Sequence, residues 1–338
     1  MRNIIGDQER IYADCAKSFG DTNLTALAGL RGSQVMVTGA TGFVGCWVLS
    51  TLTYLNDVHG FGIRIHAVAR RPDAIERKAP FLAGRDDISW IGTDIRQLVA
   101  IPEGVAWLFH AAGIPDSRHH ATNPIETVSV IGEGTLRVLH LAEQAGGLRQ
   151  ILHVSSGLVE TTVPSGRTVS PTTAYVEAKR YSETLCYAFR TQAKLPIVIT
   201  RPYTFLGPFQ DLDSPWAANN FLRAGIEGQP LKIRGDGHAV RSYLYGSDMA
   251  MVALHQMVRG ESGEIYDLGG MDAMTVLDLA NLVVGQAQRP LEIRLNTTGR
   301  QHDADTLLPD MARSTRQFGI KPAWSVEDAV KRSLAWYS

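Results

Sequence analysis

Short apolar segments alternate along the chain with longer segments in which apolar residues recur every three or four positions. The apolar segments have the length and composition of buried strands, and lie at 34–38, 63–69, 88–91, 105–110, 150–154 and 196–200. The segments at 124–146 and 173–192 have the spacing of amphipathic helices. Strands and helices in this alternation predict an α/β fold with a parallel sheet covered by helices on both faces.

The composition of the chain and its hydrophobic pattern change after about residue 202. Gly, Pro and Asn become more frequent, as in GPFQDLDSPWAANN, and the alternation becomes less regular. We expect residues 203–338 to form a smaller α/β lobe, with some of this chain returning to the larger domain formed by 33–202. Residues 1–32 predict an amphipathic helical extension that precedes the first strand.

Charge and cysteine content narrow the class of partner. The 338 residues include 33 basic and 34 acidic ones, a formal net charge of −1, without long runs of one sign. This balance argues against a nucleic-acid or membrane partner and favours a small molecule. The three cysteines lack metal-ligand spacing, so we expect no metal and no disulfides. With no signal-like or membrane-spanning segment, the chain is expected to be cytoplasmic.

Three glycines follow the first predicted strand at intervals of three residues. Gly39, Gly42 and Gly45 stand in TGATGFVG, and a helix is predicted to begin near Phe43. A phosphate can reach the N–H groups at a helix N-terminus only where no side chain intervenes. A strand, a glycine turn and a helix in this order predict a site for the pyrophosphate of a dinucleotide.

Together with several later motifs, this turn resembles the extended short-chain dehydrogenase/reductase family, in the branch of nucleotide-sugar epimerases and dehydratases. The resemblance covers about residues 33–338 and rests on these segments in order: TGATGFVG, GTDIR (92–96), HAAG (110–113), VSSG (154–157) with YVEAK (175–179), RPYTFLGP (201–208), GDGHAVRSYLYGSDMA (235–250) and GEIYDLGG (263–270). It implies a Rossmann-type doubly wound sheet in 33–202, which binds the dinucleotide, and a substrate-binding lobe in 203–338.

Tyr175 and Lys179 are candidates for proton transfer. They stand four residues apart in a helical pattern, so both side chains project from one face. A nearby ammonium favours the phenolate, so we expect Lys179 to lower the pKa of Tyr175 from its ordinary value of about 10. Ser156 is placed to hydrogen-bond the same substrate oxygen, and the resemblance favours it over Ser155. The resemblance implies Ser156, Tyr175 and Lys179 as the catalytic set.

The resemblance also implies a cofactor site of NAD(P). Its residues would be Gly39, Thr41, Gly42, Phe43, Val44, Arg70, Asp94, Ile95, Ala111, Ala112, Gly113, Tyr175 and Lys179. Within it, Asp94 would reach the adenine amino group. Where NAD-preferring members end the second strand with Asp, this chain has Arg70 and Arg71. Because arginine can pair with a 2′-phosphate, we favour NADP over NAD, although an arginine can also stack on adenine.

A nucleotide sugar is the substrate that the resemblance implies. Ser156, His119, Asn220 and Arg241 are the candidate substrate-binding residues, and the guanidinium of Arg241 suits a diphosphate. His120 and Asn219 are their neighbours in the sequence and weaker candidates.

Two departures from the family pattern bear on the reaction. Gly157 and Leu158 stand where the family's 4,6-dehydratases carry Asp and Glu, which counts against the elimination of water. Ile131 stands at the usual position of a helical Asn that supports the active site.

Three functions follow from these patterns. The first is an NAD(P)-dependent nucleotide-sugar epimerase, with Tyr175 as base. The second is an NADP-dependent nucleotide-sugar reductase, dehydrogenase or dehydratase, and the third is a cofactor-binding sensor without chemistry. The family's dimers pair through two helices, so the resemblance implies a homodimer formed by 124–146 and 173–192.

Overall fold

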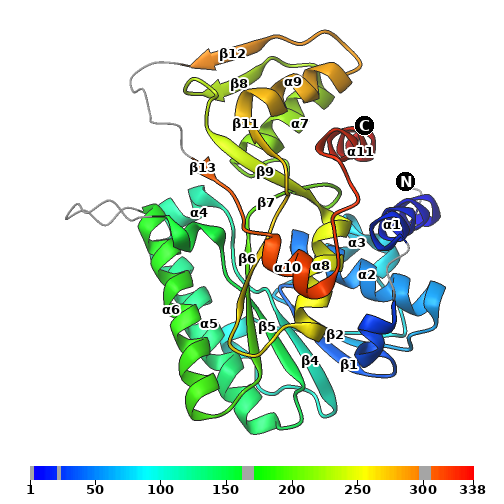
Figure 1. Cartoon of the computed structure of the whole chain (residues 1–338), viewed down its shortest axis with the longest axis vertical. Coiled ribbons are helices and arrows are strands. Elements are labelled where there is room, and N and C mark those ends of the chain that lie inside the picture. The colour runs from blue at the N-terminus through cyan, green and yellow to red at the C-terminus, as the bar shows by residue number, and fades with distance from the viewer. Residues whose placement is uncertain (1–3, 21–23, 162–170, 297–305) are drawn as a thin grey trace.

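The structure is a computed structural model, which describes residues 4–20, 24–161, 171–296 and 306–338. Figure 1 shows a larger lower body built around a central sheet and a smaller upper lobe. None of the described helices combines the length and the apolar character needed to cross a membrane.

The central sheet has seven parallel strands in the order β10-β6-β5-β4-β1-β2-β3. Its strands are β1 (Gln34–Thr38), β2 (Arg64–Ala69), β3 (Ile88–Gly92), β4 (Val105–His110), β5 (Gln150–Val154), β6 (Ile197–Pro202) and β10 (Ile265–Leu268). All five residues of β5 are buried, and four of the five in β1 are, because helices cover both faces of the sheet.

Two helix layers enclose this sheet. Figure 1 shows α5 (Pro124–Ala145) and α6 (Pro171–Gln192) side by side on one face, with α2 (Phe43–His59) and α8 (Gly246–Arg259) on the other. Most of α2 is buried, since α1 (Ile4–Phe19) and α8 pack against it. The shorter helical segments of this body are η1 (Leu24–Leu30), α3 (Ala74–Lys78), η2 (Pro80–Leu82), η3 (Ile95–Gln97), α4 (Ser117–Thr122) and η4 (Gly157–Glu160).

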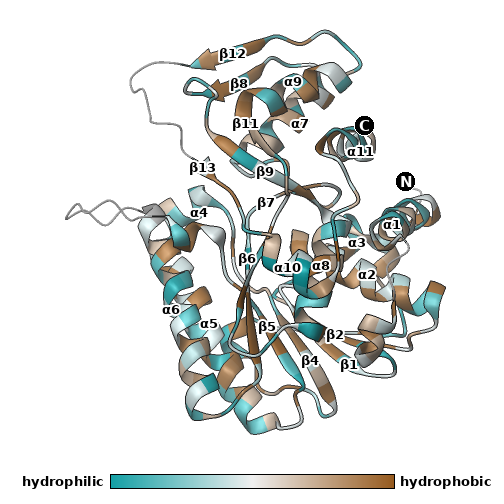
Figure 2. Ribbon diagram, viewed as in Figure 1, coloured by the Kyte–Doolittle hydropathy of each residue, from teal (hydrophilic) through white to brown (hydrophobic). Residues whose placement is uncertain are grey.

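Small sheets and helices make up the upper lobe. The strand β9 (Val240–Tyr245) pairs with β7 (Thr204–Leu206), β11 (Ala273–Thr275) and β13 (Thr306–Leu307), and β8 (Leu231–Arg234) pairs with β12 (Ile293–Asn296). The helices that follow residue 203 apart from α8 are α7 (Ala217–Glu227), α9 (Val276–Gln286), α10 (Ala312–Phe318) and α11 (Val326–Tyr337). Figure 2 shows apolar residues concentrated on the strands and on the inward helix faces.

The N-terminal helix α1 lies near α11 in Figure 1, and side-chain ion pairs join the two helices. The carboxylate of Asp14, which is buried, accepts from Arg332 Nε at 2.9 Å and from the Tyr245 hydroxyl at 2.8 Å. Lys17 reaches Asp328 at 3.1 Å. Through these contacts α1 joins the C-terminal helix to the central body.

The predicted fold class, a Rossmann-type doubly wound sheet with a smaller lobe, is confirmed. The predicted strands match the observed ones to within about two residues at each end, and α2 begins at Phe43 as expected. The strand β10, far along the chain, pairs with β6 at the edge of the central sheet. The division into 1–32, 33–202 and 203–338 stays a prediction.

Candidate active site

The glycine turn between β1 and α2 leaves a helix N-terminus open. Gly39 has φ 70°, and a Cβ there would lie 2.6 Å from the Ala111 carbonyl oxygen. A Cβ on Gly45 would overlap the Gly39 carbonyl oxygen. Gly42 is the N-cap of α2 and, within the described chain, supplies no side-chain cap. The first N–H groups of α2 are therefore suited to an anion, and this cradle fits the pyrophosphate of a dinucleotide.

Thr38 connects this turn to the next strand. Its hydroxyl oxygen accepts from the N–H groups of Ala111 and Ala112, each at 3.2 Å, and lies 2.8 Å from Nδ1 of His110. Because the hydroxyl accepts from two amides, its own proton is directed to His110. Gly113 follows, and a Cβ there would lie 3.7 Å from Nζ of Lys179. The segment Ala111–Gly113 thus lies between the glycine turn and the candidate catalytic lysine.

A second buried imidazole lies beside His110. His153 on β5 is its direct partner across the sheet, with the ring centroids 5.4 Å apart. Nε2 of His153 bonds the Ser182 hydroxyl at 2.9 Å. Burial lowers the pKa of His110 to about 3 and that of His153 well below its ordinary value, and Lys179 contributes in both cases. Both imidazoles are therefore neutral near pH 7.

A charge network follows β2 and β3 at the predicted adenine end. Asp94 is the N-cap of η3, and its carboxylate binds Arg96 at 2.8 Å, which lowers the pKa of Asp94. Arg96 also binds Glu126 at 3.0 Å, and Arg70 lies 3.9 Å from Glu126. Arg96 and Glu126 were not among the predicted site residues. The pairing of Arg96 with Asp94 two residues earlier was a local signal, but the contact with α5 was not.

The other predicted cofactor residues lie around the turn. The Thr41 carbonyl accepts from Lys78 at 3.2 Å, Phe43 stacks on Phe205, and Val44 packs against the core. Ile95 is buried against α5, where a Cβ on Gly134 would lie 2.7 Å from its side chain.

Ser156, Tyr175 and Lys179 come together at the end of β5 and the first turns of α6. All three are buried, with exposed fractions of 6, 9 and 6%. Nζ of Lys179 donates to the Val154 carbonyl at 2.8 Å and lies 6.0 Å from the centroid of the Tyr175 ring. Tyr175 hydrogen-bonds Ser156. The group joins two hydroxyls and an ammonium, which is the set that proton transfer from a substrate hydroxyl requires.

The pKa shifts in this group differ from the expected ones. Burial raises the pKa of Tyr175, and the hydrogen bond with Ser156 lowers it by a smaller amount. Burial also lowers the pKa of Lys179 to about 8. We expected Lys179 to lower the pKa of Tyr175. In this structure the net shift is upward, because desolvation of the phenolate outweighs the lowering by Ser156.

The two departures from the family pattern have structural counterparts. Ile131 is 2% exposed and shares a small apolar cluster with Tyr175, Val176 and Ala178. At Gly157, a Cβ would lie 2.7 Å from atoms of the Tyr203 ring. The ring of Tyr203 therefore occupies the space that an acidic side chain at 157 would need.

The two histidines of α4 differ in their surroundings. His119 is half-buried, and its Nε2 is buried without a hydrogen-bond partner in the described part of the chain. His120 is buried against Tyr175. An imidazole nitrogen that is buried and unpaired suits a ligand atom, and the substrate role of His119 stays a prediction.

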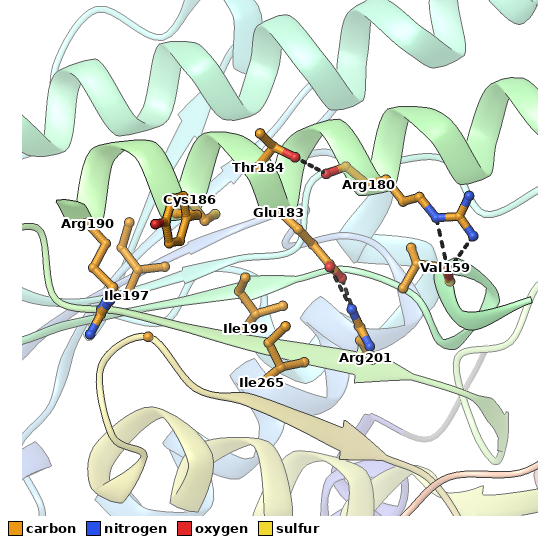
Figure 3. Close-up of a pocket in the computed structure, with 12 residues that line it drawn as sticks. Val159, Arg180, Glu183, Thr184, Cys186, Arg190, Ile197, Ile199, Arg201 and Ile265 are labelled. Carbon is orange, nitrogen blue, oxygen red and sulfur yellow. Dashed lines mark hydrogen bonds and ion pairs between the residues drawn. The ribbon is translucent and has the colours of Figure 1, made fainter. Parts of the chain in front are cut away.

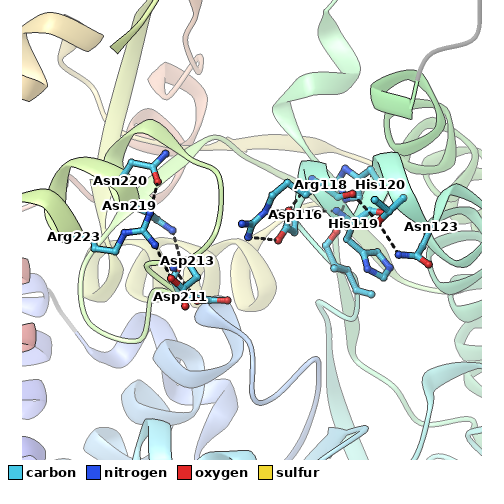
Figure 4. A network of polar contacts seen from close by, with 12 residues as sticks. Asp116, Arg118, His119, His120, Asn123, Asp211, Asp213, Asn219, Asn220 and Arg223 are labelled. Carbon is cyan, nitrogen blue, oxygen red and sulfur yellow. Dashed lines mark hydrogen bonds and ion pairs between the residues drawn. The ribbon is translucent and has the colours of Figure 1, made fainter. Parts of the chain in front are cut away.

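The loop 211–213 of the upper lobe faces α4. Figure 4 shows Arg118 and Asp116 of the lower body turned toward the loop that carries Asp211 and Asp213. The hydrogen bond with Asp116 is the largest cause that raises the pKa of Arg118, and Asp211 and Asp213 contribute less. Asn220 accepts from Arg223 at 3.3 Å.

Asn219 and Arg241 have other neighbours in the same lobe. Asn219 is buried, and its amide donates to the Asp211 carbonyl at 2.7 Å, so it holds the loop. Arg241 lies on β9 and donates to the Val240 carbonyl at 2.8 Å.

A separate pocket of about 450 Å³ lies beside the site, between α6, β6 and β10. Figure 3 shows the Glu183 carboxylate meeting Arg201 on the right, with Ile197, Ile199 and Ile265 to the left of this ion pair. Glu183 also accepts from the Ser155 hydroxyl at 2.5 Å. Of the two strand-end serines, Ser155 is thus engaged with this pocket and Ser156 with Tyr175.

Fold and site together define a class. A glycine turn suited to a dinucleotide, beside a Ser, Tyr and Lys set on a parallel sheet, is the arrangement of an extended short-chain dehydrogenase/reductase enzyme. The chain belongs to the NAD dependent epimerase/dehydratase family, whose model matches residues 35–269. The resemblance drawn from the sequence motifs is therefore confirmed.

Individual relatives are distant. UDP-glucuronic acid decarboxylase 1 of Danio rerio is 23% identical over 313 residues, which cover 90% of this chain and 72% of the relative. Two solved structures share the fold. The Bordetella bronchiseptica enzyme WbmF in complex with NAD+ is 20% identical with a TM-score of 0.76, and the match covers 91% of this chain and 93% of WbmF. A UDP-N-acetylglucosamine 4-epimerase from Methanobrevibacter ruminantium M1, in complex with UDP-N-acetylmuramic acid, is 17% identical with a TM-score of 0.78. The match covers 91% of this chain and 98% of the epimerase.

Proposed function

We propose that the protein is an NAD(P)-dependent nucleotide-sugar epimerase. The observation that carries the proposal is the buried group of Ser156, Tyr175 and Lys179 beside Ala111–Gly113 and the open N-terminus of α2. The names of the relatives support the substrate class, since they act on or bind UDP-linked sugars. When bound, the dinucleotide supplies the acceptance and return of hydride at a sugar carbon.

The chain's own residues would move the proton. Tyr175 takes the proton from the sugar hydroxyl, while Ser156 hydrogen-bonds the same oxygen and fixes its direction. Lys179 places its ammonium 6.0 Å from the centroid of the phenol ring, and this positive charge stabilises the phenolate as it forms. His119, Asn220 and Arg241 bind the substrate, and Arg241 pairs with its diphosphate.

A second candidate is a nucleotide-sugar reductase or dehydrogenase with exchanging NADP, and Arg70 favours it. Arg70 follows β2, and more than half of its side chain is exposed, so its guanidinium can receive a 2′-phosphate. A dehydratase is disfavoured, because the Tyr203 ring fills the space beside Gly157.

The test is to incubate purified protein with UDP-sugars and follow interconversion of epimers without added cofactor. We expect interconversion, and a loss of kcat of about 10²- to 10⁴-fold in Tyr175→Phe, which cannot accept the proton. A Tyr12→Phe variant, altered on α1 away from the site and from the proposed interface, serves as control. Full activity of Tyr175→Phe would contradict the mechanism, and turnover only with added NADPH would favour the reductase.

The dinucleotide is proposed to be NADP in preference to NAD. Glu126 neutralises Arg70 in part, so Glu126→Gln should tighten NADP binding and Arg70→Ala should weaken it, with NAD binding changed less. Calorimetric titration of both dinucleotides measures this. Equal affinity of the wild-type protein for NAD and NADP would contradict the preference.

We also propose a cytoplasmic homodimer that pairs through α5 and α6. Large apolar side chains are exposed on these helices, at Ile125 (85%), Val128 (44%), Tyr181 (49%) and Tyr187 (66%). A second copy would cover them. Sedimentation equilibrium should give a dimer that Val128→Glu converts to monomer, and a wild-type monomer would contradict the proposal.

Cell fractionation tests the proposed cytoplasmic location, and recovery of the protein outside the soluble fraction would contradict that location.

A further inference from the structure

His120 lies directly against the ring of the candidate base. It belongs to the short helix α4, whose N-cap Asp116 accepts from the backbone N–H of Arg118 at 2.8 Å. The His120 backbone N–H donates to the Asp116 carbonyl at 2.9 Å, and only 3% of the residue is exposed. The backbone that carries its imidazole is therefore held within this one turn.

The imidazole is stacked face to face on the phenol ring. The ring centroids of His120 and Tyr175 are 4.3 Å apart, and the planes are inclined by 11°. Nε2 of His120 lies 2.6 Å from the Ile114 carbonyl oxygen. Because a carbonyl only accepts, Nε2 carries a proton, and the ring is tied to the segment that continues from Ala111–Gly113.

The surroundings of His120 favour an uncharged ring. The charged or titratable groups that face it are His119 and Asp116 from α4, and Lys179 from α6. Burial is the main cause that lowers the pKa of His120, and the positive charge of Lys179 acts in the same direction. The contact with Tyr175 is therefore a stack of two neutral rings rather than a cation on a ring.

Tyr175 has no polar support from α5. Its cluster includes Ile131, which stands where the family pattern places an Asn, and Ile131 carries no hydrogen-bonding group. The direction of the phenol ring is thus set by packing, with the imidazole on one face.

We propose that His120 is a positioning residue for Tyr175, which holds the phenol in the plane that directs its hydroxyl to Ser156. The same residue couples this plane to the Ala111–Gly113 segment through the Ile114 carbonyl. The role in turnover rests on the proposed function, whereas the stack itself does not.

Two variants separate the stack from the hydrogen bond. His120→Phe keeps an aromatic ring and loses the donor to Ile114, and His120→Gln keeps a donor and loses the ring. His59→Ala is the matched control, because His59 forms a His–Tyr ring pair with Tyr54, with the centroids 5.1 Å apart, at the C-terminal end of α2. We expect kcat to fall by about tenfold to a hundredfold in His120→Gln with little change in KM, and to stay within about threefold of wild type in His120→Phe.

A spectroscopic titration of Tyr175 gives a readout independent of substrate. Protein labelled with carbon-13 at tyrosine Cζ is titrated by NMR, and the Tyr175 signal is identified by its absence in Tyr175→Phe. In His120→Gln, water reaches the ring face, so Tyr175 should titrate at lower pH than in wild type and in His120→Phe. His59→Ala should leave this titration unchanged.

Two results would overturn the proposal: wild-type kcat and titration in His120→Gln, or equal damage in His120→Phe and His120→Gln. Should wild-type protein convert no nucleotide sugar, the proposed function fails, while the titrations of the two variants still decide whether the stack positions Tyr175.

Discussion

Tyr175 and Lys179 are both shifted toward their neutral forms by burial, although the proposed chemistry needs both in charged form at some stage. The pKa of Tyr175 is raised and that of Lys179 is lowered to about 8. The phenolate and the ammonium therefore stabilise each other most when they form together, within a narrow range of pH.

The pH dependence of kcat/KM follows from the Lys179 shift. Lys179 is protonated below its pKa of about 8 and loses its charge above it, so kcat/KM should decline above pH 8. In Lys179→Arg the guanidinium keeps its charge, and the alkaline decline of the residual activity should move above about pH 10. A decline that stays near 8 in Lys179→Arg would assign it to another group.

At the scale of elements, the turn from β1 to α2 depends on missing side chains. A Cβ on Gly45 would overlap backbone atoms of Gly39 and Ala40, which form the turn itself. Gly285 on α9 is the opposite case, since a Cβ there would meet nothing within 4 Å. A close backbone approach therefore requires glycine at position 45, whereas nothing around position 285 requires it.

Alanine at these two glycines should act in opposite directions. Gly45→Ala should lower the free energy of unfolding by about 1–3 kcal/mol and weaken dinucleotide binding, because the turn must open. Gly285→Ala should raise it by a few tenths to about 1 kcal/mol through helix propensity, without an effect on binding. Urea denaturation and calorimetry measure both effects, and unchanged binding in Gly45→Ala would contradict this account of the turn.

Most elements were predictable from the sequence because strand and helix spacing are local signals. The strands β1, β4 and β5 and the start of α2 were predicted at their observed positions. The site was predictable only where a motif exists, as for Tyr175 and Lys179. The contact of His120 with Tyr175 joins residues 55 positions apart in the sequence, and no local pattern marks it.

Desolvation is the physical effect that the spacing of residues along the chain does not reveal. The spacing of Tyr175 and Lys179 placed an ammonium near a phenol, but burial of both depends on α4 and α5, which the spacing does not describe. Arg70 was predicted as a dinucleotide contact from its place after the second strand, whereas its neighbour Glu126 on another element was not predicted.

At the scale of the whole molecule, α1 connects the C-terminal helix α11 to the central body. Asp14 of this helix is 2% exposed and binds Arg332 of α11, so the C-terminal helix is held to the central body by a mostly buried ion pair. Lys17 and Asp328 form a second pair between the same helices, with side chains 41% and 51% exposed. The two pairs should differ in energy because water screens only the second.

Breaking the buried pair should destabilise the whole chain. Asp14→Asn leaves Arg332 without its anion and should cost about 2–4 kcal/mol, whereas Asp328→Asn should cost less than about 1 kcal/mol. Replacing both Asp14 and Arg332, as Asp14→Asn with Arg332→Met, should cost less than the sum of the single changes. Strictly additive costs in urea denaturation would show that the two side chains are not coupled.

The paired imidazoles of His110 and His153 make the fold sensitive to acid. Both pKa values lie below the ordinary value of about 6.5 that the unfolded chain has, so between these values the unfolded chain binds protons that the folded chain does not. Above about pH 6.5 the two imidazoles do not reduce the free energy of unfolding. As the pH falls below this value, the free energy of unfolding decreases by up to about 1.4 kcal/mol per pH unit for each imidazole. Urea midpoints that fall from pH 7 to pH 5 in wild type, and fall less in His153→Gln, would bear this out, and equal slopes would refute it. Because the strands that carry these imidazoles also lead to Ala111 and Ser156, a preparation kept at mildly acidic pH should lose bound dinucleotide as its fold weakens.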